Sequence, residues 1–459
     1  MVRKFTANNV NEARDLAVQT VYEVTEKGAY ANLTIDKTLR ESKLNNMDRS
    51  LFTELVNGTI RMLKHLDWVL DFFLKQKITT QNPWLRSILR VAAYQIIFMD
   101  RVPDFASVND AVEIARRRCN ENLARVVNGV LRNLIRQQEN ITYPPSHSPE
   151  YLAIYYSHPP EMVDYLLYHF SRQETIDILK YNNQPARLDL RVNILKTSRE
   201  VLISLLQESK VNCYPSPNLP HGIRVESLEQ PLEKLSAYKK GFFYVQNEAS
   251  MLAGYILAPE SGEVIVDLCC GLGGKTTHIA ELMGNRGFIK AFDSYNHKIK
   301  ILKVNCSRLG INIVDERVKD VLLMEEQPTA CRVLLDVPCS GTGVLNRRSD
   351  ARWKKHEEQV EQISHLQYQM LQKAAAMISP GGYLLYSTCS IRKEENEEVV
   401  YAFLSDSNNN YDLLGFEDRI SFFPLDLKDK KSAAQGMLTI LPGKYNCDGM
   451  FYALLRRKQ

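Results

Sequence analysis

Two cysteines stand just past the ends of apolar runs typical of buried strands, in the C-terminal half of this 459-residue sequence. Cys339 follows the run 333–335, and Cys389 follows the run 383–386. Open α/β sheets bind ligands at the carboxyl ends of their parallel strands, so thiols at these positions are candidates for chemistry. A pair of thiols suits addition to a pyrimidine base, because a thiolate both adds and leaves readily.

A carboxylate accompanies the first of these thiols. Asp336 ends the apolar run and stands three residues before Cys339. The simplest interpretation of a lone aspartate there is a side chain that caps the loop. A carboxylate and a thiol at the rim of a sheet that also carries a cofactor turn can instead address one small polar ring together. Asp336 is therefore a candidate site residue.

The surroundings of the second thiol indicate a reactive cysteine. The stretch 390–400 after Cys389 is typical of a capped helix start and contains Arg392 and Lys393. Free backbone N–H groups and cationic side chains lower the pKa of a nearby thiol. The sequence therefore predicts a thiolate nucleophile at Cys389, although a buried, inert cysteine is the commoner case.

A glycine-rich turn at residues 271–275 follows another apolar run and indicates a ligand site. The turn has three possible interpretations: a dinucleotide site, a P-loop or an S-adenosylmethionine site. The P-loop pattern fails because Cys269 stands five residues before Gly274, and the G-x-G-x-x-G pattern fails because Thr276 stands at its third glycine position. Asp293, at the end of the next predicted strand, is well placed to accept hydrogen bonds from ribose hydroxyls. The turn predicts a nucleotide-like cofactor.

The elements that must position these residues alternate between strands and helices after residue 244. Apolar runs at 264–266 and 288–292 alternate with a helical pattern from Thr276 and another near 298–309. That rhythm predicts a mostly parallel, doubly wound sheet in a catalytic domain at 245–459.

Upstream of this domain the chain predicts two further regions. Consecutive prolines at 144 and 145 break the helical pattern, so residues 143–244 are expected to form a linker and a small α+β module. Residues 1–142 carry apolar residues at spacings of three and four, which predicts an all-α bundle.

The basic excess of the chain lies in that helical region. The predicted helix 122–137 carries Arg125, Arg132 and Arg136 opposite its apolar face. A solvated helix face is the simpler interpretation of such a stripe. The three consecutive arginines at 116–118 favour a surface that contacts phosphates.

The composition argues against a secreted protein, a membrane-spanning protein and a metal-binding protein. The nine cysteines include no C-x-x-C pair, and no apolar stretch follows the charged residues at the N-terminus. The longest apolar candidate, 88–99, is interrupted by Arg90 and is shorter than the roughly 20 residues of a membrane helix. We therefore expect a cytoplasmic protein with no signal peptide, no membrane partner and no metal site.

Together these motifs resemble the RNA cytosine-5 methyltransferases that use S-adenosylmethionine. The resemblance rests on the glycine turn, on the segment 336–343, on the segment 387–390 and on the ending 447–453. The helical region, with its stretch 127–132, is similar to the antitermination-factor NusB fold. The resemblance covers nearly the whole chain and implies a Rossmann-like catalytic domain behind a NusB-like, RNA-binding bundle.

The resemblance also implies roles for single residues. Cys389 would attack the base, Cys339 would assist product release, and Asp336 would contact the base and stabilise the charge that develops. The residues expected to hold S-adenosylmethionine are Cys269, Cys270, Gly271, Leu272, Gly273, Gly274, Lys275, Asp293, Asp320 and Asp336. The family's turn usually reads C-A-A-P-G-G-K, so this chain departs from it by lacking the proline.

The implied function is methylation of carbon 5 of a cytosine in 16S ribosomal RNA through a covalent cysteine adduct, with no obligate protein partner. Two alternatives remain open. The same chemistry could act on another RNA, such as transfer RNA. Alternatively, the chain could be a catalytically weak RNA-binding or assembly factor, in which the helical region carries the function.

Overall fold

A computed structural model of the protein describes residues 11–100, 102–324, 330–354, 357–406 and 410–459. The chain forms two compact units, Met1–Gln184 with Leu345–Lys354 and Pro185–Val344 with Lys355–Gln459. The division into domains 1–142, 143–244 and 245–459 stays a prediction. The first ten residues, where the sequence predicts no signal peptide, lie outside the described ranges. None of the helices in those ranges has the length and apolarity needed to cross a membrane.

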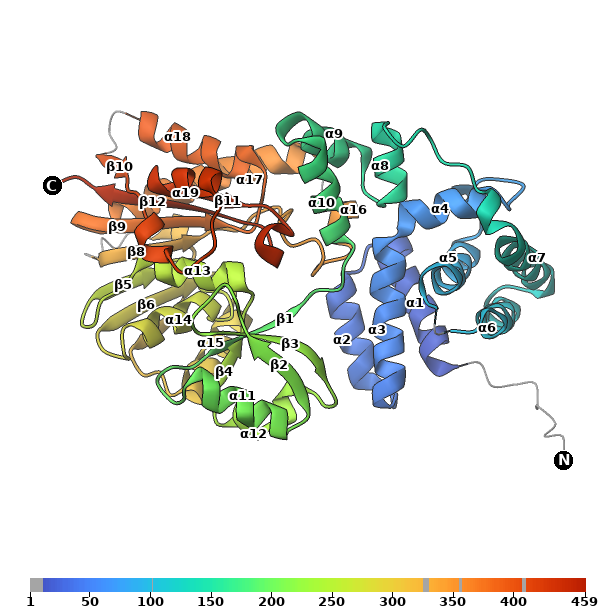
Figure 1. The fold of residues 1–459 in the computed structure, drawn as a ribbon, viewed down its shortest axis with the longest axis horizontal. Coiled ribbons are helices and arrows are strands. Elements are labelled where there is room, and N and C mark those ends of the chain that lie inside the picture. Colours follow the sequence, from blue (N-terminus) through green and yellow to red (C-terminus); the bar gives the residue numbers. More distant parts are fainter. Residues whose placement is uncertain (1–10, 101, 325–329, 355–356, 407–409) are drawn as a thin grey trace. The chain divides into compact units, whose positions relative to one another are not determined.

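The first unit is all-helical, which confirms the predicted class (Figure 1). Its helices are α1 (Glu12–Lys27), α2 (Ala31–Glu41), α3 (Asn46–Arg61), α4 (Leu63–Asp71), α5 (Pro83–Phe98), α6 (Asp104–Arg118), α7 (Glu121–Gln137), α8 (Pro149–Tyr155), α9 (Pro160–His169), α10 (Arg172–Asn182) and the single turn α16 (Ala351–Lys354). Several begin at polar caps of the expected kind, such as Asn120, whose side chain accepts from the N–H of Leu123 at 3.0 Å before α7.

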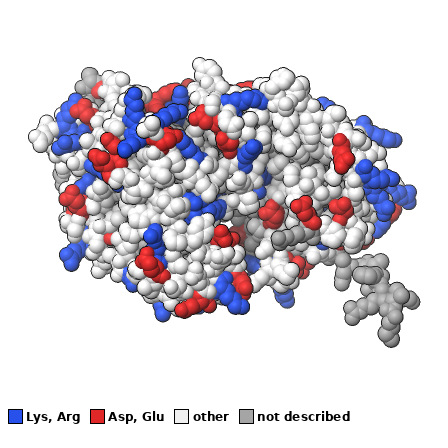
Figure 2. Space-filling model, in the orientation of Figure 1, with Lys and Arg blue, Asp and Glu red and all other residues white. Residues whose placement is uncertain are grey.

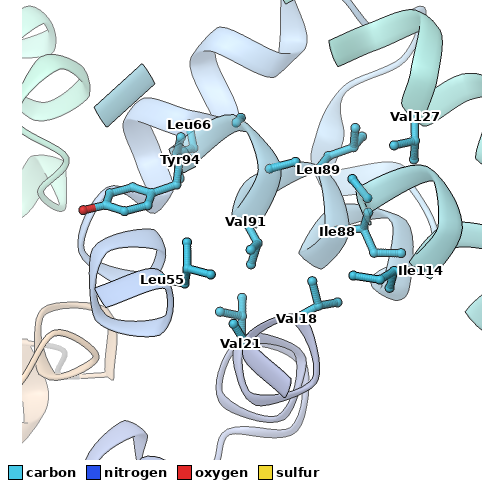
Figure 3. Close-up of a cluster of buried hydrophobic side chains, with 14 of the residues drawn as sticks. Val18, Val21, Leu55, Leu66, Ile88, Leu89, Val91, Tyr94, Ile114 and Val127 are labelled. Atoms are coloured by element: carbon cyan, nitrogen blue, oxygen red, sulfur yellow. The ribbon is translucent and has the colours of Figure 1, made fainter. Parts of the chain in front are cut away.

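The apolar stripes of these helices meet in one core. Figure 3 shows Val18 and Val21 of α1 facing Leu55 of α3 and Val91 of α5, with Ile114 of α6 beside them. All of these side chains are buried. Since packing of amphipathic faces supplies most of the stability of helices of this length, the spacing of apolar residues accounts for the bundle.

The second unit begins with the small α+β module. It comprises β1 (Leu188–Val192), α11 (Arg199–Glu208), β2 (Val211–Pro215), β3 (Gly222–Leu228), α12 (Ser236–Lys239) and β4 (Phe243–Val245). The strands form an antiparallel sheet in the order β2-β3-β1-β4. Arg191 of β1 is fully buried and pairs with Glu281 of the following module at 2.9 Å.

The larger module of this unit is a mixed, eight-stranded sheet covered by helices (Figure 1). Its elements are α13 (Glu248–Leu257), β5 (Val264–Asp267), α14 (Gly274–Leu282), β6 (Phe288–Asp293), α15 (Asn296–Leu309), β7 (Val314–Val318), β8 (Ala330–Asp336), α17 (Glu357–Ala376), β9 (Ile378–Thr388), α18 (Glu397–Ser405), β10 (Tyr411–Leu413), α19 (Leu427–Ala434), β11 (Met437–Ile440) and β12 (Met450–Arg457).

The strand order of this sheet is β10-β12-β9-β8-β5-β6-β7, with β11 paired to β12. The five strands from β9 to β7 are parallel, and β10, β11 and β12 add antiparallel pairs at one side. This confirms the predicted doubly wound, mostly parallel sheet. Because the five parallel strands all end at the same edge, every loop that carries a candidate residue emerges there.

Candidate active site

The two cysteines lie together at this edge. The strands β8 and β9 are parallel neighbours, with Asp336 paired to Ser387 in register. The loops that follow, residues 337–343 and 389–392, are called here the cysteine loops. They bring the sulfur atoms of Cys339 and Cys389 to 3.1 Å from one another. Fifty residues of sequence separate the two thiols, and strand pairing closes that separation.

The surroundings of the Cys339 thiol disfavour its thiolate form. The hydrogen bond with Cys389 raises the pKa of the Cys339 thiol well above its ordinary value, and burial raises it further. Nearby carboxylates at Glu395 and Asp336 act in the same direction, because negative charge disfavours a thiolate. Cys339 therefore stays protonated at neutral pH and can donate its hydrogen toward the sulfur of Cys389.

A buried carboxylate that sequence reasoning missed joins the two cysteine loops. Glu395 is fully buried and accepts from the backbone N–H of Ser340 at 2.7 Å and from the hydroxyl of Ser390 at 2.8 Å. Gln367 of α17 donates to the same carboxylate at 3.2 Å. The only sequence signal was the acidic stretch after Cys389, and a charged stretch is more often a solvated helix start.

A helix does begin within the predicted stretch 390–400, but it does not begin beside Cys389. Residues 389–392 form a loop, a short 3₁₀ turn follows at Lys393–Glu395, and α18 begins only at Glu397. The N–H groups expected to be free are also occupied, since that of Ile391 donates to the hydroxyl of Thr342 at 3.1 Å. The polar residues that resemble a helix cap instead connect one cysteine loop to the other.

Backbone hydrogen bonds hold the cysteine loops as well. The N–H of Gly343 donates to the carbonyl of Cys389 at 2.9 Å, and the N–H of Gly449 donates to the carbonyl of Gly343 at 2.8 Å. A Cβ atom at Gly343 would lie 2.5 Å from the Gly449 oxygen, so only glycine fits this close approach. The ending 447–453 thus lies against the first cysteine loop.

Asp336 lies between the thiols and the glycine turn. Its carboxylate forms an ion pair with Lys275 at 2.6 Å and accepts from the hydroxyl of Ser387 at 2.8 Å. The Asp336 side chain keeps 29% of its surface exposed, so one face stays open to a ligand. The structure therefore brings Lys275, Asp336 and the two thiols to the same edge of the sheet.

The glycine turn has the backbone shape that its sequence requires. Gly271 and Gly273 have φ angles of 56° and 92°, in the left-handed region that favours glycine. The N–H of Gly271 donates to the Asp293 carboxylate at 3.1 Å, and Lys298 pairs with that carboxylate at 3.2 Å. Gly274 begins α14, so the turn opens at a helix N-terminus.

The remaining candidate cofactor residues are placed around that turn. Asp320 follows β7 and accepts from the N–H of Leu322 at 2.9 Å. The thiols of Cys269 and Cys270 are enclosed, and burial raises the pKa of both. Exposed apolar side chains accompany them: the predicted Leu272 in the turn, and two that sequence reasoning missed, Tyr295 after β6 and Val318 at the end of β7.

These features fit an adenosine-containing cofactor. Glycines with left-handed backbone leave the turn after β5 open, and carboxylates stand at the ends of β6 and β8 and just after β7. Apolar surface left exposed between polar groups is what a purine ring buries on binding. The lack of the family's usual proline at position 272 does not close the turn, since Leu272 is 46% exposed.

One more buried carboxyl supports the turn. Asp267 ends β5 and accepts from the Thr276 hydroxyl at 2.6 Å. Burial raises the pKa of Asp267 to about 7, and the hydrogen bond from Thr276 opposes that shift only in part.

The arginines that the sequence offers as phosphate contacts divide into two sets. Arg116 pairs with Glu113 at 2.5 Å and with Glu121 at 2.6 Å, while Arg118 pairs with Asp15 at 3.0 Å. These contacts weaken the expectation that the run 116–118 contacts phosphates. The arginine stripe, defined as Arg125, Arg132 and Arg136 of α7, is instead exposed. Figure 2 shows basic side chains gathered where α7 lies in Figure 1.

Comparisons with known proteins agree with this architecture. The NusB family model matches residues 11–136, a model for the ferredoxin-like domain of RsmF/B-like methyltransferases matches 158–231, and the model for 16S rRNA methyltransferase RsmB/F matches 254–456. The crystal structure of PH0851 is 28% identical, with a TM-score of 0.79, over 98% of this chain and 100% of that one.

Two relatives match along their whole length. The probable ribosomal RNA small subunit methyltransferase B of Synechocystis is 34% identical over 97% of this chain and 99% of its own. The ribosomal RNA small subunit methyltransferase B of Salmonella newport is 30% identical over 98% of this chain and 99% of its own. Fold and site thus define a Rossmann-like methyltransferase that carries a NusB-like helical domain. The chain belongs to the ribosomal RNA small subunit methyltransferase B family.

Proposed function

We propose that this methyltransferase modifies carbon 5 of a cytosine in 16S ribosomal RNA and that Cys389 forms a covalent bond with the base. The observation that carries the proposal is the pair of thiols 3.1 Å apart at the ends of β8 and β9, beside the Asp336–Lys275 ion pair. The names of the relatives support ribosomal RNA of the small subunit as the substrate.

Cys389 begins the reaction. Carbon 5 of cytosine is a weak nucleophile, and addition of a sulfur atom at carbon 6 moves an electron pair onto carbon 5. As the Cys389 sulfur bonds to carbon 6, negative charge spreads into the ring toward N3. The Asp336 carboxylate accepts from the amino group beside N3 and holds that edge of the base, with Lys275 balancing the charge of the carboxylate.

The cofactor of the proposal is S-adenosylmethionine. When bound, it supplies the electrophilic methyl group that carbon 5 accepts. The turn at Gly271 and Gly273 receives it, and Asp293 and Asp320 are the acceptors for its hydroxyl and amino groups. The exposed faces of Leu272 and Tyr295 are apolar surface for its ring.

Cys339 completes the cycle. Carbon 5 must lose its proton to solvent water, and the electron pair of that C–H bond restores the ring double bond as the bond between carbon 6 and the Cys389 sulfur breaks. Cys339 is held as a neutral thiol next to that sulfur, so it can deliver a proton to the departing thiolate. In this proposal Cys389 carries out addition and Cys339 carries out release.

The helical unit supplies RNA affinity in this proposal. The arginine stripe is exposed, and its members have only weak or neutral partners, such as Asn128 for Arg132 at 2.8 Å and Asn133 for Arg136 at 2.8 Å. Guanidinium groups in this state can exchange those partners for phosphate oxygens. The target cytosine must leave any base stack to reach the thiols, as for other enzymes that modify bases.

The test combines the protein, S-adenosylmethionine with a labelled methyl group, and unmodified 16S RNA. We expect label transfer by the natural protein, none by Cys389→Ala, and an accumulating covalent protein–RNA band in Cys339→Ala. Calorimetry with S-adenosylmethionine alone measures cofactor affinity, which both variants should retain. The reverse pattern of adducts would exchange the two thiol roles.

The same experiment decides between the open alternatives. Transfer to transfer RNA but not to 16S RNA would keep the chemistry and replace the substrate. Absence of transfer to either RNA, in a folded protein that binds RNA, would favour a binding or assembly factor.

A further inference from the structure

Helix α15 begins at the edge of the sheet that carries the cysteine loops. The helix follows β6 after a short connection that contains Tyr295, so its first turn lies beside the glycine turn. Its 14 residues extend roughly 21 Å from that edge. The helix, the small α+β module and the candidate active site all belong to one compact unit.

The charge on this part of the chain is of one sign. Residues 294–313 contain three lysines, one arginine and no aspartate or glutamate. Lys298 pairs with Asp293 at 3.2 Å, and the Arg308 guanidinium donates to two backbone carbonyls of the small α+β module at 3.0 Å. The contacts within the protein therefore account for two of the four cations.

The two other lysines lie on the outer side of the helix with two apolar residues. Lys300, Ile301, Lys303 and Val304 fall within one arc when successive residues advance by about 100°. Both lysines are exposed, and Ile301 and Val304 are 42% and 66% exposed. Among the residues that the structure describes, none forms an ion pair with either lysine. These four residues are called here the lysine face.

The charges of the lysine face do not stabilise the fold. Lys300 and Lys303 stand three positions apart on the helix, where like charges repel, and α15 has no acidic residue to pair with them. Burial and then Glu316 of β7 raise the pKa of Cys306, which places that carboxylate near the buried side of α15. A face that only keeps a protein soluble mixes both signs of charge and few apolar side chains. The lysine face thus fits a partner that supplies negative charge.

Basic side chains continue at the far end of α15. Lys196 of the small α+β module donates to the carbonyl of Arg308 at 2.9 Å and to that of Lys240 at 2.9 Å. Lys196 and Lys240 are both exposed. Because Lys196 lies at the last turn of α15, its charge balances the negative end of the helix dipole, which would otherwise repel a polyanion.

We propose that the lysine face binds the phosphate backbone of the RNA strand that carries the target base. This inference rests on the proposed function and adds a contact for its substrate. The ammonium groups of Lys300 and Lys303 pair with phosphate oxygens and release counterions, while Ile301 and Val304 pack against ribose or base. Phosphate contacts position a strand without reading its sequence. Since α15 begins at the edge where the thiols lie, a strand held along it leads to them.

Acetylation of lysines tests the contact without turnover. The full-length protein is treated with sulfo-N-hydroxysuccinimide acetate alone, with unmodified 16S RNA, or with vesicles of phosphatidylcholine and phosphatidylserine, and the modified lysines are read by mass spectrometry. We expect RNA to slow acetylation of Lys300 and Lys303 several-fold and high salt to remove that protection. Lys430 and Lys431, exposed on α19 at the other side of the sheet, should keep their rates.

A double variant gives the effect on binding and catalysis. Lys300→Gln combined with Lys303→Gln should reduce the slope of log affinity for RNA against log salt by about 1.4, at about 0.7 for each contact with a single strand. The KM for RNA should rise several-fold, with a much smaller change in kcat. Affinity for S-adenosylmethionine should stay unchanged, because Lys298, which pairs with Asp293, is left in place.

The matched control is Lys430→Gln combined with Lys431→Gln, which removes an equal charge and should change neither the slope nor the KM. Natural acetylation rates at both lysines of the face with RNA bound would overturn the proposal, as would a salt slope of the double variant equal to that of the control. Protection by the vesicles and not by RNA would replace RNA with a lipid surface. Absence of methyl transfer by the natural protein would overturn the proposed function, whereas acetylation and the salt slope would still judge the RNA contact.

Discussion

At the cysteine loops, a fully buried carboxylate accepts hydrogen bonds from both loops, whereas on α7 three arginines lie open to solvent. The first region fixes the positions of two sulfur atoms, and the second leaves long side chains able to rearrange. Reaction at a base needs the former, because addition and elimination depend on geometry. Contact with a phosphate backbone needs the latter, because its energy comes from charge and counterion release. Substitutions in the two regions should therefore differ in size and in kind.

The largest effect is expected from Glu395→Ala. The change leaves the Ser340 N–H and the Ser390 hydroxyl without their buried acceptor, which costs about 2–5 kcal/mol of the free energy of unfolding. The loops should lose their alignment, and methyl transfer should fall by about 100-fold or more. Urea unfolding and initial rates measure the two effects. Glu398→Ala, at an exposed position of the same stretch, is the matched control, and equal rates in both variants would refute a role for the buried carboxylate.

The next largest effect concerns the pH dependence of stability. The pKa of Asp267 is about 7 in the folded protein and 3.8 in the unfolded chain, so the folded state holds this proton more tightly. The resulting stability is present below about pH 4 and is lost as the pH rises toward 7. As the pH rises from acidic to neutral, the natural protein should therefore lose up to about 4 kcal/mol of its free energy of unfolding relative to Asp267→Asn. Urea unfolding across this pH range checks it.

The exposed Asp412, 67% open to solvent, supplies the control for that measurement. Asp412→Asn should leave the pH profile parallel to that of the natural protein. A parallel profile in Asp267→Asn as well would show that the buried carboxyl is not the origin of the dependence.

Substitutions at two glycines, one in each region, should have smaller effects on stability, and the two effects should be opposite in sign. Gly343→Ala would place its Cβ 2.5 Å from the Gly449 oxygen, and the required shift should cost about 1–3 kcal/mol. At Gly129 of α7 an added Cβ atom would meet no other atom within 4 Å, so Gly129→Ala should stabilise by about 0.5–1 kcal/mol. Thermal melting measures both. If both substitutions changed the melting temperature in the same direction, the contrast between a close-packed region and an open one would be refuted.

The smallest single effect belongs to the arginine stripe. Each of Arg125→Gln, Arg132→Gln and Arg136→Gln should weaken RNA binding a few-fold and reduce the slope of log affinity against log salt by about 0.7–0.9. Arg116→Gln is the control, since this arginine is already paired with Glu113 and Glu121. Filter binding at several salt concentrations measures the slope. An effect of Arg116→Gln as large as those of the stripe would show that exposure does not select the phosphate contacts.

Much of the fold could be predicted because local patterns carry it. Apolar residues at spacings of three and four set the helical bundle, and short apolar runs between helical patterns set the parallel strands. Glycines at 271 and 273 marked a turn whose backbone needs left-handed φ angles. The helix start expected beside Cys389, but found at Glu397, shows the limit of local patterns. The polar stretch after Cys389 is typical of a helix start, but here Ser390 and Glu395 form hydrogen bonds to Ser340, in a loop some 50 positions upstream.

The sequence by itself determined the chemistry that is present: two thiols and a carboxylate at strand ends, a glycine turn, and a set of basic residues near the N-terminus. Those features depend on residue type and on short spacings, which can be recognised within a short stretch of the sequence. Only the tertiary structure decided which of them meet. It set the 3.1 Å separation of the Cys339 and Cys389 sulfurs and the burial of Glu395 between two loops. Contacts of this kind join distant positions, and strand pairing and burial alone bring those positions together.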